Sequence, residues 1–212
     1  MRSLFSTCTL RTMPYSMVII AFAIAIVNTF WYGTGMEERK TRKSWLDAGL
    51  QALASEGADG LRIMLIAEKL GVTKGSFYWH FKNLEEYQLA VLGQWEHLHT
   101  EQIIEYVEHA GGEVHAKLYN LVAVTVSSDF SLSRAIRSWS LVNQNVREVQ
   151  ARVDQKRIEY AAKLLRATGW SKDDAMTLGR WGYCALIGHS VLPGPPITEK
   201  QIKLILSTWI PR

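Results

Sequence analysis

One stretch decides the fold, and it reads I-A-E-K-L-G-V-T-K-G-S-F-Y-W-H-F-K from Ile66 to Lys82. Its first part carries apolar side chains at helical spacing up to Leu70, and Gly71 then stands where a left-handed residue ends a helix. Thr73 follows as the expected N-cap of a second, short helix. The stretch therefore predicts two helices joined by a tight turn, which is a helix-turn-helix.

The second helix of this pair has two unlike faces. Phe77 and Phe81 are four residues apart and face one way. Gly75, Tyr78 and Trp79 face largely the other way. A short helix that presents a small residue and polar-tipped aromatic side chains suits close approach to nucleic acid in a groove. The alternative interpretation is a surface helical hairpin of a larger helical domain.

The segment from Gly71 to Lys82 resembles, almost letter for letter, the turn and recognition helix of the tetracycline-repressor (TetR) family of bacterial transcription regulators. The resemblance extends from about Lys43 to about Leu92. It implies an all-α homodimer, with an N-terminal three-helix helix-turn-helix head and a helical-bundle body for effector binding and dimerisation. It also implies two partners, a near-palindromic double-stranded DNA operator and a small-molecule effector that releases the DNA. We therefore expect a cytoplasmic regulator, a repressor in the simplest case, and no enzyme.

The recognition segment, residues 73–80, receives most of the expected DNA contacts. The residues expected to meet DNA here are Thr73, Lys74, Gly75, Ser76, Tyr78, Trp79 and His80. Gly75, Ser76 and Trp79 are assigned to base edges, and the others to the sugar-phosphate backbone. The alternative for His80 is a helix-end cation that only complements the helix dipole.

The helix before the turn departs from the family's pattern. The family usually places Ser or Thr near Arg62 as a helix cap, and polar residues where Met64 and Leu65 stand. It also often carries a phosphate-touching lysine near Leu84. We therefore expect that phosphate contact at Lys82 instead.

The charge distribution also favours a nucleic-acid partner. The 212-residue chain has a net charge of +4, and residues 36–82 hold eight Lys/Arg against six Asp/Glu, whereas the charges balance from residue 83 onward. Four basic residues directly precede the helix-turn-helix and are expected to meet phosphate: Arg39, Lys40, Arg42 and Lys43. The alternative is an ordinary solvated arm.

Composition narrows the remaining function classes. Hydrophobic residues make up 48% of the chain, which is typical of a globular protein. The two cysteines, Cys8 and Cys184, lie far apart, and no Cys/His cluster has zinc spacing, so a reducing cytosol without a metal or another cofactor is expected. The sequence contains no nucleophile elbow and no phosphate-binding glycine loop, so it points to no catalytic centre.

Residues 1–35 differ from the rest of the chain. An apolar stretch lies between residues 17 and 32, and only Asn28 and Thr29 interrupt it. Three interpretations remain open. The favoured one is a misplaced start, with the natural chain beginning at Met36. The others are a membrane anchor, short of the ~20 residues that a spanning helix needs, and a secretory signal.

The remaining chain is predicted to form a head over residues 36–84 and a body over residues 85–212. The expected helices cover residues 40–56, 83–109, 113–127, 132–145, 147–168, 172–192 and 198–210. The last two are apolar on most faces, so we expect them to pair with their copies as a four-helix dimer interface. Burial in the chain's own core is the alternative.

Two further groups of residues are candidate sites in the body. The residues that could line an effector cavity are Trp139, Tyr160, Trp181, Tyr183 and His189, although aromatic residues at helical spacing more often belong to a core. A stripe at successive i, i+4 steps consists of His97, Glu101, Glu105 and His109. This stripe is the basis of an alternative function, a small metal-binding protein or enzyme. A solvated helix face is the favoured interpretation.

Overall fold

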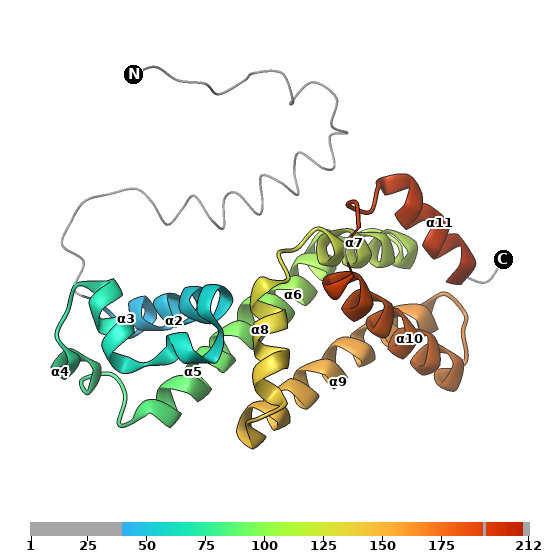
Figure 1. Ribbon diagram of the computed structural model, residues 1–212. Coiled ribbons are helices and arrows are strands. Elements are labelled where there is room, and N and C mark those ends of the chain that lie inside the picture. The colour runs from blue at the N-terminus through green and yellow to red at the C-terminus, as the bar shows by residue number, and fades with distance from the viewer. Residues whose placement is uncertain (1–39, 193, 210–212) are drawn as a thin grey trace, which may run out of the picture. The chain divides into compact units, whose positions relative to one another are not determined.

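The computed structural model describes residues 40–192 and 194–209, and all regular elements in these ranges are helical (Figure 1). They are α2 (Arg42–Glu56), the 3₁₀ turn η1 (Gly57–Leu61), α3 (Ile63–Leu70), α4 (Lys74–Phe77), α5 (Leu84–Glu96), the π turn η2 (His97–Glu101), α6 (Gln102–His109), α7 (Val114–Val126), α8 (Ser131–Ser140), α9 (Gln144–Ala167), α10 (Lys172–Val191) and α11 (Glu199–Trp209). The predicted all-α class is confirmed. We call α2 to α4 the head, the run α5–η2–α6 the connecting helix, and α7 to α11 the body.

Polar side chains cap the starts of several helices. Thr41 forms a capping box with Ser44 at the start of α2. Asn83, Asn143 and Ser171 each accept a hydrogen bond from the backbone N–H three residues on, at 2.8, 3.1 and 3.1 Å. These side chains satisfy donors that the first helical turn leaves open.

The helix predicted over residues 132–145 is shorter than expected, because α8 ends at Ser140. The Arg147 guanidinium donates from Nε to the Ser140 carbonyl at 3.1 Å and from Nη2 to the Leu141 carbonyl at 2.9 Å. These bonds satisfy acceptors that a helix end leaves open. Leu141 and Val142 continue the apolar pattern in the sequence but form an exposed turn before α9.

The connecting helix is continuous over the predicted range, but it is not α-helical throughout. The carbonyl of His97 accepts from the N–H of Gln102, five residues on, which makes η2 a π turn. Leu89 lies on the outward side of the helix and is 43% exposed. The inward face of α5 is formed by Tyr87, Val91, Leu92 and Trp95.

A single hydrophobic core crosses from the head into the body. Trp45 of α2, Ile136 of α8 and Val153 of α9 all belong to it and are fully buried. Gly49 allows α2 and α5 to approach, since a Cβ there would overlap the Tyr87 hydroxyl and lie 2.7 Å from Cγ2 of Val91. A domain boundary at residue 84 stays a prediction, because the packing is continuous across it.

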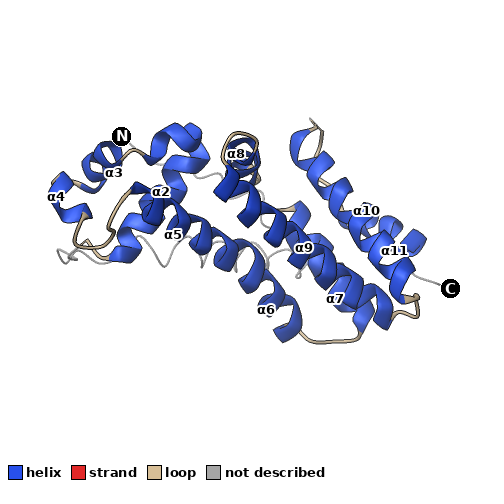
Figure 2. Cartoon of the chain, turned by 90° about the horizontal axis from the view of Figure 1, so that it is seen from below, coloured by secondary structure: helices blue, strands red, loops and turns tan. Residues whose placement is uncertain are grey.

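The body consists of helices that lie side by side. α9 and α10 pack along much of their length, and α7 contacts both α9 and α11 (Figure 2). None of the helices in the described ranges combines the length and the hydrophobicity that crossing a bilayer requires. The apolar stretch at residues 17–32 lies outside the described residues.

Candidate nucleic-acid interface

The recognition segment begins after a turn that has the predicted form. Gly71 adopts φ 67° and ψ 32°, the left-handed conformation that ends α3. Its N–H donates to the Glu68 carbonyl at 3.0 Å, and the Val72 N–H donates to the Ala67 carbonyl at 3.0 Å. The helix-turn-helix therefore has the local geometry that the sequence predicts.

The α-helical part of the recognition segment is short. The α-helix covers Lys74–Phe77, and the N–H groups of Tyr78, Trp79 and His80 then each donate to the carbonyl three residues back. Thr73 occupies the N-cap position, but its hydroxyl makes no capping hydrogen bond. The segment is therefore a single α turn extended by tighter turns.

Two phenylalanines hold the recognition segment from behind. Phe77 is 0% exposed and Phe81 2% exposed. The Phe77 ring lies 5.4 Å from the ring of Trp45 and 5.5 Å from that of Tyr87, both edge to face. Because such contacts are worth about 0.5–1.5 kcal/mol each beyond burial, the segment is fixed to α2 and α5. The prediction that both phenylalanines face the same way is confirmed, and that way is toward the core.

The opposite face of the segment points to solvent. Tyr78 is 54% and Trp79 86% exposed, and Lys74 and Gly75 are exposed beside them. Ser76 differs from its predicted role, because its hydroxyl is buried and has no hydrogen-bond partner among the described residues. Ser76 lies between the exposed Gly75 and the buried Phe77, at the edge of the two faces, and its side-chain oxygen points to the inner side.

Two of the basic residues at and just before the start of α2 contact the end of the helix-turn-helix. The His80 ring donates from Nε2 to the Lys40 carbonyl at 3.1 Å. In the free protein, this hydrogen bond connects the recognition segment to the backbone just before α2. The Arg42 guanidinium lies 4.8 Å above the Phe81 ring. Lys43 pairs with Asp47 at 3.1 Å. Arg39 lies outside the described residues.

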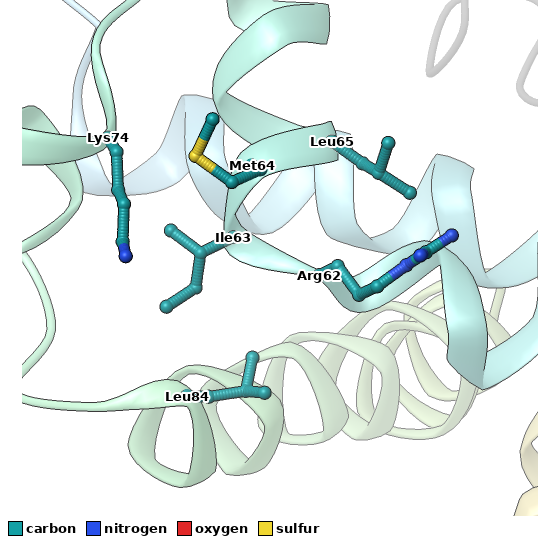
Figure 3. A pocket seen from close by; sticks show the side chains of 6 residues that line it. All are labelled: Arg62, Ile63, Met64, Leu65, Lys74 and Leu84. Atoms are coloured by element: carbon teal, nitrogen blue, oxygen red, sulfur yellow. The ribbon is translucent and has the colours of Figure 1, made fainter.

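A shallow, open hollow of about 380 Å³ lies beside the recognition segment (Figure 3). It is lined by Arg62, Ile63, Met64, Leu65, Lys74 and Leu84. The apolar start of α3 and the leucine at residue 84 are two separate departures from the family's pattern in the sequence. In the structure they lie together, beside Lys74. Arg62 makes no side-chain cap, as predicted, and Lys82 is exposed just before α5.

The five candidate cavity residues in the body do not form one site. Trp139, Tyr160 and Tyr183 are buried, whereas Trp181 is 70% exposed. Gly179 and Tyr183 of α10 are both buried, and Trp181, midway between them, points away from them. Trp181 therefore cannot line a cavity within one subunit. His189 stacks edge to face on Phe130 at 5.9 Å.

The proposed metal stripe does not assemble. His97 bonds to Glu101 at 3.0 Å, and the ring of His109 donates from Nδ1 to the Glu105 carbonyl at 2.8 Å. The π turn between the two halves rotates one pair relative to the other. Nowhere in residues 40–192 and 194–209 do three or more His, Cys, Asp or Glu side chains gather as metal ligands would.

Sequence reasoning missed a polar cluster at the centre of the body. Asp154 of α9 accepts from the two terminal nitrogens of Arg137 at 3.0 and 2.9 Å, from the Tyr183 hydroxyl at 2.6 Å and from Gln150 at 2.6 Å. Burial alone would raise the pKa of Asp154, but these hydrogen bonds outweigh it and hold the pKa below its ordinary value. The cluster therefore joins α8, α9 and α10 through one ionised carboxylate.

Comparison with known proteins finds sequence similarity over part of the chain. Residues 46–86 match the family model of bacterial regulatory proteins of the tetR family. The chain is 38% identical to the HTH-type transcriptional regulator TtgW of Pseudomonas putida over 64 residues, which are 30% of this chain and 48% of that protein. It is 44% identical to the class D tetracycline repressor protein of Escherichia coli over 45 residues, 21% of each chain. The matches thus span half or less of these relatives.

The fold similarity extends much further than the sequence similarity. The reduced form of NemR from E. coli superposes with a TM-score of 0.65 and covers 79% of this chain and 94% of that chain, at 15% identity. The body therefore shares its architecture with this protein, although its side chains differ.

Proposed function

We propose that this chain, whose residues 46–86 belong to the TetR family of bacterial regulatory proteins, is a DNA-binding transcriptional regulator that acts in the cytoplasm. The observation that carries the proposal is the division of the recognition segment into two faces. Phe77 and Phe81 are sealed in the core, while Lys74, Tyr78 and Trp79 are presented to solvent on a fixed support. Such a segment can enter a major groove.

The regulator acts as a dimer in this proposal. Four large apolar side chains on and directly after α10 and on α11 are at least 60% exposed and would be covered by a second copy: Trp181, Val191, Leu192 and Leu204. A two-fold pair places two recognition segments about 34–36 Å apart, or slightly more, on a near-palindromic operator. Light scattering tests the pairing, and a monomer at working concentrations contradicts it.

The third part of the proposal is release of DNA by a small-molecule effector bound in the body. The continuous core from α2 to α9 supports it, because a change among the body helices is passed on to the head. A coupling of about 1–3 kcal/mol between the two sites is the usual size. Repression followed by ligand-dependent release is the simplest form of such control.

A binding titration with the gene's own upstream DNA at low salt tests the proposal. Lys74→Ala should weaken the complex by a similar amount for every DNA sequence and reduce the salt dependence of log K by about one unit, because one phosphate contact is lost. Lys172→Ala is the matched control, since this exposed lysine lies on α10, outside the head. Absence of binding by the wild-type protein would contradict the proposal.

A further inference from the structure

Within residues 40–192 and 194–209, Arg157 of α9 is hydrogen-bonded only to uncharged groups. It donates from Nε to the Thr100 hydroxyl at 2.9 Å, from Nη2 to the His99 carbonyl at 3.1 Å and from Nη1 to the Tyr183 hydroxyl at 3.3 Å. Its guanidinium also lies 5.1 Å from the centre of the Trp95 ring. Among the described residues, no carboxylate forms an ion pair with it.

The surroundings of Arg157 do not balance its charge. The carboxylate of Asp154 is already engaged by Arg137 in a bidentate pair. Burial and then the neighbouring Arg157 charge lower the pKa of His99 to about 4, against the opposing effect of the Asp129 carboxylate, so this imidazole is neutral at pH 7. Arg137, Asp154 and Arg157 together thus carry one positive charge in excess, and a partly buried charge without a directly paired counter-ion is unfavourable.

Arg157 also has hydrogen-bonding capacity to spare. A guanidinium has five N–H donors, of which three are used in the contacts above, so about two remain for another acceptor. The side chain is only partly buried, so a solute can reach it from solvent. A carboxylate matches the planar fork of a guanidinium with two parallel hydrogen bonds.

We propose that Arg157 anchors a binding site for a small organic monoanion with a carboxylate group, and that this anion is the effector. The inference rests on the proposed regulatory function and specifies the chemical class of its ligand. One bound negative charge neutralises the excess charge of the Arg137, Asp154 and Arg157 cluster. The two remaining donors of Arg157 then form charge-assisted hydrogen bonds to the anion, and the contacts to uncharged partners weaken as the guanidinium moves toward it.

The site has a direct connection to the head. Thr100 and His99, which Arg157 contacts, belong to the π turn of the connecting helix. An anion that draws the guanidinium away removes two hydrogen bonds from this turn. The same helix begins at Leu84, two residues after Lys82 and beside the recognition segment. Occupation of the site therefore changes the support of the DNA-reading surface.

Thermal unfolding of the full chain tests the site with acetate, benzoate and inorganic phosphate at constant ionic strength. Benzamide is the uncharged counterpart of benzoate. We expect acetate or benzoate to raise the unfolding midpoint by roughly 5 °C at a hundredfold excess over Kd, and benzamide to leave it unchanged. A response to phosphate alone, or equal responses to benzoate and benzamide, would overturn the carboxylate assignment, as would no response.

Two substitutions on α9 separate this site from general ion effects. Arg157→Gln should abolish the response, whereas Arg152→Gln, which alters an arginine 59% exposed and paired with Glu96, should retain it. Arg157→Lys covers the case of a misfolded glutamine variant, and its response should survive with at least tenfold weaker affinity. A response that persists in folded Arg157→Gln, or vanishes in Arg152→Gln, contradicts the proposal.

The DNA titration distinguishes the two proposals. If wild type binds operator DNA and no carboxylate affects stability or DNA release, the anion site is wrong and the regulator proposal stands. If carboxylates stabilise the protein through Arg157 but no DNA is bound, the site stands and the regulator proposal fails. Benzoate or acetate should weaken the wild-type DNA complex and leave that of Arg157→Gln unaffected.

Discussion

The head and the body are built around opposite kinds of interior. The head closes on aromatic rings, with Trp45, Phe77 and Tyr87 in edge-to-face contact and fully buried. The body holds partly buried charges, with Asp154 and Arg157 in the middle of its longest helix. Apolar packing favours one arrangement, whereas hydrogen-bonded ions can exchange partners at small net cost. The aromatic interior suits a head that keeps a rigid DNA-contacting surface, and the charged interior suits a body that responds to a ligand.

The largest expected effect comes from disrupting the aromatic core of the head. Phe77→Ala should lower the free energy of unfolding by about 3–5 kcal/mol, because it leaves a cavity at the centre of the head. Urea unfolding measures the change. Trp79→Ala is the matched control, since this ring is 86% exposed and its loss should change stability by less than about 0.5 kcal/mol while weakening DNA binding. Equal losses of stability in both variants would refute the two-faced segment.

Measuring stability as a function of pH tests the polar interior of the body. The pKa of His99 is about 4 in the folded protein, below the ordinary value of about 6.5, because of burial and then the Arg157 charge. Between these values the unfolded chain binds a proton that the folded chain does not bind, so stability should fall as the pH falls through this window. The loss should reach about 3 kcal/mol near pH 4.

Urea unfolding at about pH 7, 5.5 and 4.5 measures the slope. His99→Gln should flatten it, whereas His115→Gln, at an exposed position, should keep it. An unchanged slope in His99→Gln would mean that this imidazole is not held neutral against Arg157.

The smallest expected effect lies where the two regions meet. Asn83→Ala removes the side chain that accepts from the Glu86 N–H at 2.8 Å and caps α5. Stability should fall by about 1 kcal/mol. Asn83→Gly should restore most of it, since glycine is tolerated at N-caps. A loss as large as that of Phe77→Ala would show that the cap supports more than the first turn of the helix.

The head could be predicted because its signals are local. The turn depends on Gly71, and the two faces depend on residues within one helical turn, so spacing alone gives the motif. Its spacing assigned Ser76 to the DNA-facing side, but in the structure its hydroxyl is turned inward. A rotation about one side-chain bond decides between these two orientations, and residue spacing does not predict that rotation.

The helices of the body could be predicted from the sequence, but the polar cluster between them could not. Asp154 lies 17 residues from Arg137 and 29 from Tyr183, so their meeting depends on how three helices pack. The end of α8 was missed for a similar reason. Leu141 and Val142 extend the helical pattern, and the termination depends on Arg147, which follows later in the chain.

The π turn also determines where the connecting helix can change length. A π turn holds one residue more than the α turn that it replaces, and here the surplus is absorbed between His97 and Glu101. Trp95 before the turn and Val107 after it are both fully buried, so the helix keeps its inward side on either flank. Deleting one codon elsewhere in residues 84–109 would rotate everything downstream by about 100°. Deleting it within the π turn would leave both flanks in register, so gene variants one codon shorter at this place can still fold.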